Sequence, residues 1–442
     1  MYLLRTYYNI KYVITMDISE IIKTLDKWNF WNQKIDTGFQ RLFYMEKLSR
    51  LLKMSEIVAL TGVRRSGKST LILQLIEELI KKGVKPKNTL YVNFEEPNFA
   101  DNLNVKFLVK LFDAYLETFD PKGKIYLFLD EVQMVEGWER FVASLYDRKA
   151  NVKIFVTGSS SKLLKGEIST LLSGRYVSEI IYPLGFSEFL DFKKEKYSPL
   201  IKNTKLFNYL REYIEFGGFP RVVMEKEEYG KKIILTEYFN SILEKDILLR
   251  HKIRNTKDVR EITNFSLANI SSQISSYRMK KDFDISSLSA RRYFGYFEES
   301  FLLQFATFFS YSVKKQVYNP QKVFSIDTGL RNAVSFKFSE DIGKLLENIV
   351  FLELLRKKEK PYYWEGKGEV DFVLRRGHKV SELVNVCYSL DKKTLEREIK
   401  SLEEGMAEFK NTKARLIYWE GRSLKHKKIE FVNILDFLLL GR

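Results

Sequence analysis

The sequence predicts a multidomain α/β protein whose first large domain is a parallel sheet with helices on both faces. From about residue 41, short apolar runs alternate with amphipathic helical segments, an order that is typical of parallel sheets. The runs are apolar almost throughout, as expected for strands that are buried on both sides. The expected strands are Ile57 to Thr61, Leu90 to Phe94, Ile125 to Leu129 and Ile154 to Thr157.

Length and pattern together predict several domains. A chain of 442 residues exceeds what one hydrophobic core usually supports. We expect a helical N-terminal extension at 1–40, the sheet core at 41–184, a helical lid at 185–252, a winged helix-turn-helix at 253–335 and a smaller α/β domain at 336–442. Met16 opens an amphipathic segment, so residues 1–15 are expected to add little structure and Met16 is an alternative start.

Net charge and cysteine content indicate which kind of partner the protein binds and in which compartment it occurs. The formal net charge of +17 favours polyanionic partners, with nucleic acid first, although a lysine-rich proteome also yields basic soluble enzymes. The single cysteine, Cys387, excludes an internal disulfide, and three scattered histidines exclude a zinc cluster of ordinary spacing. With no internal disulfide we expect a reducing, cytoplasmic compartment, and because no apolar stretch approaches the length of a transmembrane helix we expect a soluble protein.

The strongest motif lies between the first strand and the helix that follows it. Gly62 to Ser69 matches G-x-x-x-x-G-K-[ST], in which backbone amides and the helix N-terminus face phosphate oxygens. We expect Lys68 to contact the β and γ phosphates of ATP or ADP and Ser69 to be a ligand of Mg²⁺. A glycine turn before an unrelated helix is the alternative. The residues expected to contact the nucleotide are Gly62, Val63, Arg64, Arg65, Ser66, Gly67, Lys68, Ser69 and Thr70.

An acidic strand end supplies the second half of the expected site. The apolar strand that begins at Ile125 ends in Asp130 and Glu131. Phosphoryl transfer is catalysed by positioning and by neutralising charge around a metal, so we expect Asp130 to hold Mg²⁺ and Glu131 to polarise water. As a surface turn, Asp-Glu would be ordinary. Paired with the glycine loop, it indicates an ATP-hydrolysing site.

Two further positions are weaker candidates. Ser159 and Ser160 follow the strand that ends at Thr157, where a hydroxyl that senses the γ phosphate is expected between the glycine loop and the acidic strand. Their alternative is a polar loop chosen for its turn chemistry. Arg175 follows closely and is a candidate arginine finger, acting in cis or in trans, or a plain surface arginine.

Together these motifs resemble archaeal and bacterial AAA+-type ATPases that carry an uncharacterised C-terminal region. The resemblance covers about residues 41 to 442. It rests on Ala59 to Thr70, Asp130 to Glu139, Gly174 to Tyr176, Pro183 to Phe189, Gly217 to Pro220, Lys322 to Leu330 and Glu369 to Phe372. In that family the Gly-Gly-x-Pro turn lies by the adenine, which implies nucleotide contacts for Gly218 and Pro220.

The resemblance also implies a winged helix in the middle of the chain. The basic pairs Lys280-Lys281 and Arg291-Arg292 flank a polar start to a helix and are candidate contacts to duplex DNA. The alternative is a winged helix that packs against protein.

The last region resembles restriction-endonuclease-like folds, in which Glu347, Asp371 and a Glu-x-Lys pair would bind metal and activate water. Here Asn385 and Cys387 stand in the places of that pair. Glu382 lies on the other face of the expected strand because side chains alternate along it. An amide and a thiol cannot supply the missing charges, so we expect little or no nuclease activity.

The sequence therefore predicts Mg²⁺-dependent ATP binding and hydrolysis, coupled to DNA binding or remodelling. A rival hypothesis is a signalling or defence ATPase that oligomerises on a protein or ligand and does not bind DNA. A third is a nucleotide switch with negligible turnover.

Overall fold

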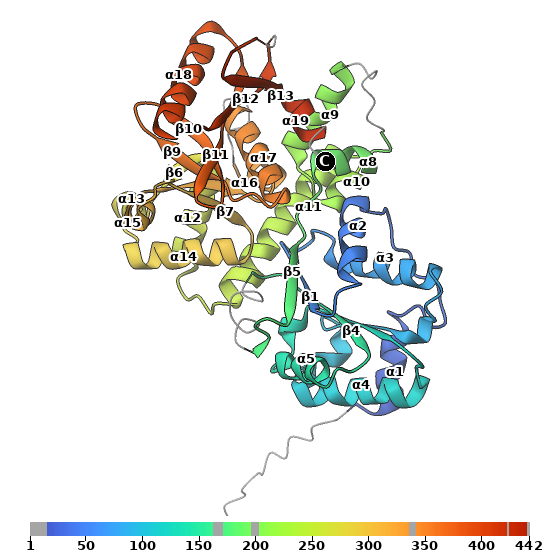
Figure 1. Ribbon diagram of the computed structural model, residues 1–442. Coiled ribbons are helices and arrows are strands. Elements are labelled where there is room, and N and C mark those ends of the chain that lie inside the picture. The colour runs from blue at the N-terminus through green and yellow to red at the C-terminus, as the bar shows by residue number, and fades with distance from the viewer. Residues whose placement is uncertain (1–15, 162–170, 196–202, 336–341, 422–423, 440–442) are drawn as a thin grey trace, which may run out of the picture. The chain divides into compact units, whose positions relative to one another are not determined.

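The structure is a computed structural model of the 442-residue chain, and it describes residues 16–161, 171–195, 203–335, 342–421 and 424–439 (Figure 1). The expected extension at 1–15 lies outside the described residues. The chain divides into two compact units. The first unit comprises the described residues of 16–60, 69–158 and 171–179, and the second comprises those of 61–68, 159–161 and 180–439.

A five-stranded sheet forms the centre of the first unit, with the strand order β2-β3-β4-β1-β5. The strands are β1 (Ile57–Thr61), β2 (Thr89–Asn93), β3 (Ile125–Asp130), β4 (Val152–Gly158) and β5 (Tyr176–Ile180). β2, β3 and β4 pair in parallel, so the α/β class and the expected strands are confirmed. β4 lies between the strand before the glycine loop and the acidic strand, as the sequence predicted. The short β5, of mixed polarity, was not predicted.

Helices cover both faces of this sheet. α4 (Val105–Phe119) and α5 (Trp138–Asp147) lie on one face, and α3 (Lys68–Lys81) lies on the other (Figure 1). α2 (Leu42–Leu51) precedes β1. α4 begins where the side chain of Asn104 accepts hydrogen bonds from two backbone amides of its first turn.

The segment after Met16 belongs to the core of the first unit, so a domain boundary at residue 40 cuts through that core. α1 (Ile18–Asp26) starts with a capping box and buries Ile21 and Leu25 against the α4 side of the sheet. The side-chain amide of Asn29 donates to the backbone carbonyl of Tyr91 and accepts from its N–H, both at 2.8 Å. These contacts replace a missing strand neighbour at β2, which lies at the sheet edge.

In the second unit, the described part of residues 185–252 is largely helical. The helices are α8 (Phe186–Phe192), α9 (Asn203–Phe216), α10 (Pro220–Met224), α11 (Glu228–Ser241) and the π-helix Ile242–Leu249. One continuous hydrophobic cluster extends from these helices to α19 (Ile434–Leu439), near the end of the described chain. All three regions expected from 185 onward contribute to this cluster, and a second hydrophobic cluster around Val370, Leu383 and Leu402 lies mostly within the last region.

The middle region has the order helix, strand, two helices, strand, short helix, strand. Its elements are α12 (Thr256–Ala268), β6 (Ser272–Ile274), α13 (Ser276–Phe283), α14 (Ser287–Glu299), β7 (Leu303–Thr307), α15 (Val313–Tyr318) and β8 (Gln321–Ser325). The strands form an antiparallel sheet with the order β6-β8-β7. α16 (Thr328–Val334) follows.

The last region contains a second five-stranded sheet, with the order β13-β12-β11-β10-β9. Its elements are α17 (Ile342–Arg356), β9 (Tyr362–Glu365), β10 (Glu369–Arg376), β11 (Lys379–Ser389), α18 (Lys392–Glu408), β12 (Lys413–Glu420) and β13 (Ile429–Asn433). β9, β10 and β11 are antiparallel, and β11, β12 and β13 are parallel. Over the described ranges, no helix is both long and apolar enough to cross a membrane.

Candidate nucleotide-binding site

The glycine loop has a backbone that only glycine fits at two positions. Gly62 has φ 145° and Gly67 has φ 96°, both outside the range that L-residues favour. A Cβ on Gly62 would lie 2.2 Å from the carbonyl oxygen of Ile181. Arg65 also has a positive φ, of 70°. The loop is therefore held in an unusual conformation, as is common at ligand-binding backbones.

The lysine of the loop is buried at the start of α3. Lys68 is 4% exposed, and its ammonium donates to the carbonyl oxygens of Gly62 at 3.0 Å and Val63 at 3.1 Å. Because a helix N-terminus attracts anions, this position places a buried cation at the start of a helix, where phosphate binding is favoured. Ser66 is also buried, and Thr70 points outward.

The acidic strand end is buried and surrounded by hydroxyl groups of the first unit. Asp130 is 1% exposed and accepts a hydrogen bond from the Tyr91 hydroxyl at 2.7 Å and another from the Thr157 hydroxyl. The Ser69 hydroxyl also bonds to this carboxylate. Burial and the charge of Glu131 raise the pKa of Asp130, and the hydroxyl donors oppose the rise. The two expected metal ligands, Ser69 and Asp130, therefore lie together.

Glu131 is held by its neighbours in a left-handed turn. Its φ is 54°, its N–H donates to the Thr157 hydroxyl oxygen at 3.0 Å, and its carboxylate accepts a hydrogen bond from Gln133. Sequence reasoning missed Tyr91 and Thr157. Thr157 was within reach of that reasoning, because a hydroxyl that ends an apolar strand beside the acidic strand is unusual.

The serines and the arginine singled out from the sequence have partners elsewhere. Ser159 donates to a carboxylate oxygen of Asp246 at 3.1 Å, and Ser160 donates to Glu299 at 3.2 Å. Arg175 lies 3.2 Å from Asp147, and both side chains are at least a third exposed. Arg175 and Asp147 belong to the first unit, and the serines belong to the second.

Asp246 is a further functional candidate that the sequence did not reveal. It lies in the π-helix and is 1% exposed. Arg64 of the glycine loop donates to both of its oxygens, from Nε at 3.0 Å and Nη2 at 3.3 Å. Arg250 donates to Asp246 at 3.0 Å and to Ser159 at 3.2 Å. One lid carboxylate therefore holds two guanidinium groups, one of which comes from the loop.

The Gly-Gly turn has a structural partner inside the second unit. The Gly218 N–H donates to the carboxylate of Asp327 at 2.7 Å, and its carbonyl accepts from the Leu184 N–H at 2.7 Å. A Cβ on Gly217 would lie 1.9 Å from Asp327. The N–H of Gly218 is thus used within the protein, and its carbonyl oxygen already accepts one hydrogen bond. Pro220 begins α10.

The four basic residues proposed for DNA lie on two consecutive helices. Lys280 and Lys281 end α13, and Arg291 and Arg292 lie on α14. All four are exposed, and Arg291 donates to the Ser276 hydroxyl at 3.3 Å. Within the described ranges none of the four forms an ion pair with a carboxylate, so their charge faces outward.

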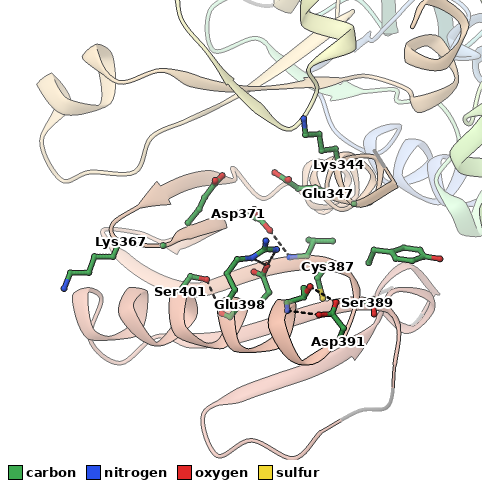
Figure 2. Close-up of a pocket in the computed structure, with 16 residues that line it drawn as sticks. Lys344, Glu347, Lys367, Asp371, Cys387, Ser389, Asp391, Glu398 and Ser401 are labelled. Carbon is green, nitrogen blue, oxygen red and sulfur yellow. Dashed lines mark hydrogen bonds and ion pairs between the residues drawn. The ribbon is translucent and has the colours of Figure 1, made fainter. Parts of the chain in front are cut away.

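Three of the residues singled out in the last region, Glu347, Asp371 and Cys387, line a cavity of about 660 Å³ (Figure 2). Glu347 on α17 and Asp371 on β10 both line it, and Figure 2 shows their carboxylates near each other. Asn385 is fully buried, donates to Glu398 at 2.6 Å and accepts from the Asp371 N–H at 3.2 Å. Cys387 is buried. Outside the lining of the cavity, Glu382 pairs with Arg415 at 3.2 Å.

Comparison with known proteins agrees with the geometry of the first unit. Residues 54–190 match a family model described as an AAA domain, and residues 208–341 match a domain of unknown function, DUF8612. The chain is 38% identical over 370 residues to the uncharacterized protein MJ1544 of Methanocaldococcus jannaschii, covering 80% of each chain. It is 32% identical over 407 residues to an uncharacterized protein of Haemophilus influenzae, covering 90% of this chain and 97% of the relative.

The fold and the site define a P-loop ATPase of the AAA+ type. The chain belongs to one family with MJ1544 and the Haemophilus influenzae protein. Among solved structures, the Walker-type ATPase PABY2304 of Pyrococcus abyssi aligns with a TM-score of 0.43 and 16% identity, over 69% of this chain and 99% of that one.

Proposed function

We propose that this chain binds ATP with Mg²⁺ on the glycine loop and hydrolyses it. The observation that carries the proposal is the pairing of the Ser69 hydroxyl with the buried Asp130 carboxylate. Both are hard oxygen ligands, the kind that Mg²⁺ prefers in nucleotide sites. Ser69 follows Lys68 directly in the chain, at the start of the same helix. Bound Mg²⁺ would supply neutralisation of phosphate charge.

The protein groups have distinct roles in this proposal. The amides of 62–68 and the start of α3 cradle the phosphates, and Lys68 exchanges its loop carbonyl partners for phosphate oxygens. Glu131 orients the attacking water, and Thr157 fixes the backbone that carries Glu131. Ser160 and Arg175 remain candidates for sensing and for transition-state stabilisation, and each would first leave its carboxylate partner.

Phosphate release tests the proposal directly. Wild type is expected to release phosphate from ATP only with Mg²⁺ present. Glu131→Gln is expected to bind ATP normally in calorimetry yet turn over at least about 100-fold more slowly. Lys68→Ala is expected to lose binding. Absence of ATP binding by wild type with excess Mg²⁺ would refute the proposal, whereas binding without turnover would identify a nucleotide switch.

We further propose that hydrolysis is coupled to duplex DNA through residues 253–335, as a winged helix. The order helix, strand, two helices and two further strands supports this assignment, and α14 then occupies the place of a recognition helix. The exposed charges of Lys280, Lys281, Arg291 and Arg292 support it as well. The double variant Arg291→Ala/Arg292→Ala is expected to weaken DNA binding and to flatten its salt dependence by about two units of slope. Salt-insensitive binding, or none, would contradict it.

A second candidate is an ATPase that docks a protein through the same region. Apolar side chains are exposed around α15, and they are Tyr311, Val313, Val317 and Tyr318. Such residues favour protein contact over phosphate contact. Light scattering with and without ATP, beside a DNA mobility assay, separates the two candidates. The last region, 336–442, is proposed as an endonuclease-like fold without cleavage activity.

A further inference from the structure

A lysine of the middle region lies inside the acidic cluster of the last region. Lys322 is on β8 and is 2% exposed. Its ammonium lies 2.9 Å from Glu347 and 3.1 Å from Asp371, and it also pairs with Glu369. The carboxylates come from α17 and β10, so one side chain joins two elements of the last region to a strand of the middle sheet.

The ammonium takes the position that a metal would need. In the fold that the last region resembles, the carboxylates at positions 347 and 371 would be metal ligands. Both Asp371 oxygens are already engaged, one by Lys322 and the other by the Val386 N–H at 2.9 Å. A divalent ion close to these oxygens would lie within a few ångströms of a buried ammonium, and like charges at that separation repel strongly.

The charge of Lys322 is secured by its surroundings. Burial alone would lower its pKa, but Glu347, Asp371 and Glu369 outweigh burial and hold the pKa well above the ordinary value. Three carboxylates therefore surround the Lys322 ammonium within ion-pairing distance.

We propose that Lys322 is a built-in cation that replaces a divalent metal in the cluster of Glu347, Glu369 and Asp371 and locks the middle region to the last one. The lock is independent of ATP hydrolysis. Because the Lys322 ammonium from β8 already neutralises these carboxylates, no metal is needed there. The acid that Asn385 replaces and the lysine that Cys387 replaces then have no metal to serve.

A competing explanation is that Lys322 is a displaced catalytic lysine of a working nuclease. That explanation requires the wild type to bind metal beside Lys322 through Asp371. The proposed lock requires the opposite, namely that metal enters only when the ammonium is removed. Metal binding therefore distinguishes the two.

Terbium luminescence gives a local readout. Tyr363 lies with its ring centroid 5.9 Å from the Lys322 ammonium, so a Tb³⁺ ion at the ammonium position would be sensitised by this ring. Lys322→Met is expected to give saturable tyrosine-sensitised emission that disappears in Lys322→Met/Asp371→Asn. Wild type and Lys322→Arg are expected to give no emission that depends on Asp371. Lys344→Met is the matched control, because Lys344 lines the same cavity but, within the described residues, has no ion pair.

Thermal unfolding supplies the second measurement. Lys322→Met is expected to unfold at a lower temperature than wild type and to recover part of the loss with millimolar Mn²⁺, whereas the midpoint of Lys344→Met stays near wild type. Asp371-dependent Tb³⁺ emission from the wild type would overturn the proposal, and that arm requires no variant of Lys322 to fold. A folded Lys322→Met protein that takes up no metal would overturn it as well.

Discussion

Arg64 in the phosphate-binding loop and Asp246 in the π-helix form a two-pronged ion pair, with Nε and Nη2 of the arginine on the two carboxylate oxygens. Positions 182 residues apart are joined in this way, and the carboxylate is almost fully buried. Arg250 shares the same carboxylate. The Asp246 side chain thus connects the glycine loop to the lid helices. The first prediction concerns this connection.

Asp246→Ala should destabilise the protein by about 3 kcal/mol or more, because it removes a buried carboxylate that bonds two guanidinium groups. Glu244→Ala is the matched control on the same helix, since the pair that Glu244 forms with Arg260 is nearly half exposed. That control should cost less than about 1 kcal/mol. Denaturant midpoints compare the two, and equal losses would show that the buried pair has no special weight.

Tyr91→Phe and Thr157→Val should each raise the Mg²⁺ concentration needed for half-maximal ATPase activity by about 10-fold. Their hydroxyls orient the Asp130 carboxylate, and partners that orient a metal ligand typically have effects of this size. Titrating Mg²⁺ at saturating ATP measures the change. Tyr126→Phe, on the same strand as Asp130, is the control and should leave the titration unchanged. An unaltered Mg²⁺ requirement in both variants would remove Tyr91 and Thr157 from the site.

Gly218→Ala should destabilise the protein by more than about 4 kcal/mol, or prevent folding, because the added Cβ would lie 2.2 Å from the Leu184 carbonyl oxygen. Gly295→Ala in α14 meets nothing within 4 Å and should be neutral or stabilising by up to about 1 kcal/mol. Thermal unfolding of the two variants tests the contrast. A well-folded Gly218→Ala protein would show that the turn tolerates a side chain.

Asp327 should make stability fall as pH rises through the weakly acidic range. Burial raises its pKa to about 6, against the backbone donors that include Gly218. The folded protein therefore holds a proton that the unfolded chain has already released, so the contribution is fully present below about pH 4 and is lost as pH passes about 6. The total difference is about 3 kcal/mol. Unfolding of wild type and Asp327→Asn from pH 4 to 7 measures it, and parallel curves would contradict it.

The parts of the fold that were predictable are those whose signal is local. β1 is buried along its whole length and appears in the sequence as an unbroken apolar run, and the same holds for most of β2 to β4. β5 and β6 lack such runs, and nothing local marks them. The helix at Ile18–Asp26 was expected from its amphipathic pattern, but a pattern shows that a face is buried and not what buries it. The amphipathic pattern therefore predicts the helix, but it does not predict that Ile21 and Leu25 join the hydrophobic core of the first unit.

The site divides in the same way. Ser69, Asp130 and Glu131 follow from motifs whose spacing the chemistry of phosphate and metal dictates. Asp246 and Lys322 have no local signal, because each acquires its role from a partner far away in the sequence. The sequence favours Ser159 and Ser160 as the hydroxyl residues after β4, but these serines donate to Asp246 and Glu299. The hydroxyl that bonds Asp130 is that of Thr157, which precedes them.

The chain has one cysteine, Cys387, and that thiol lies buried in β11. Burial raises its pKa to about 12, so at neutral pH almost no reactive thiolate is present in the folded protein. Alkylating reagents should consequently modify Cys387 only after the sheet that contains β11 opens. The rate of modification therefore measures the rate of that opening. Because Cys387 reacts slowly, a single cysteine added at the surface should be labelled much faster than the native thiol. Fluorescent probes that follow the two units can therefore be attached without first removing Cys387.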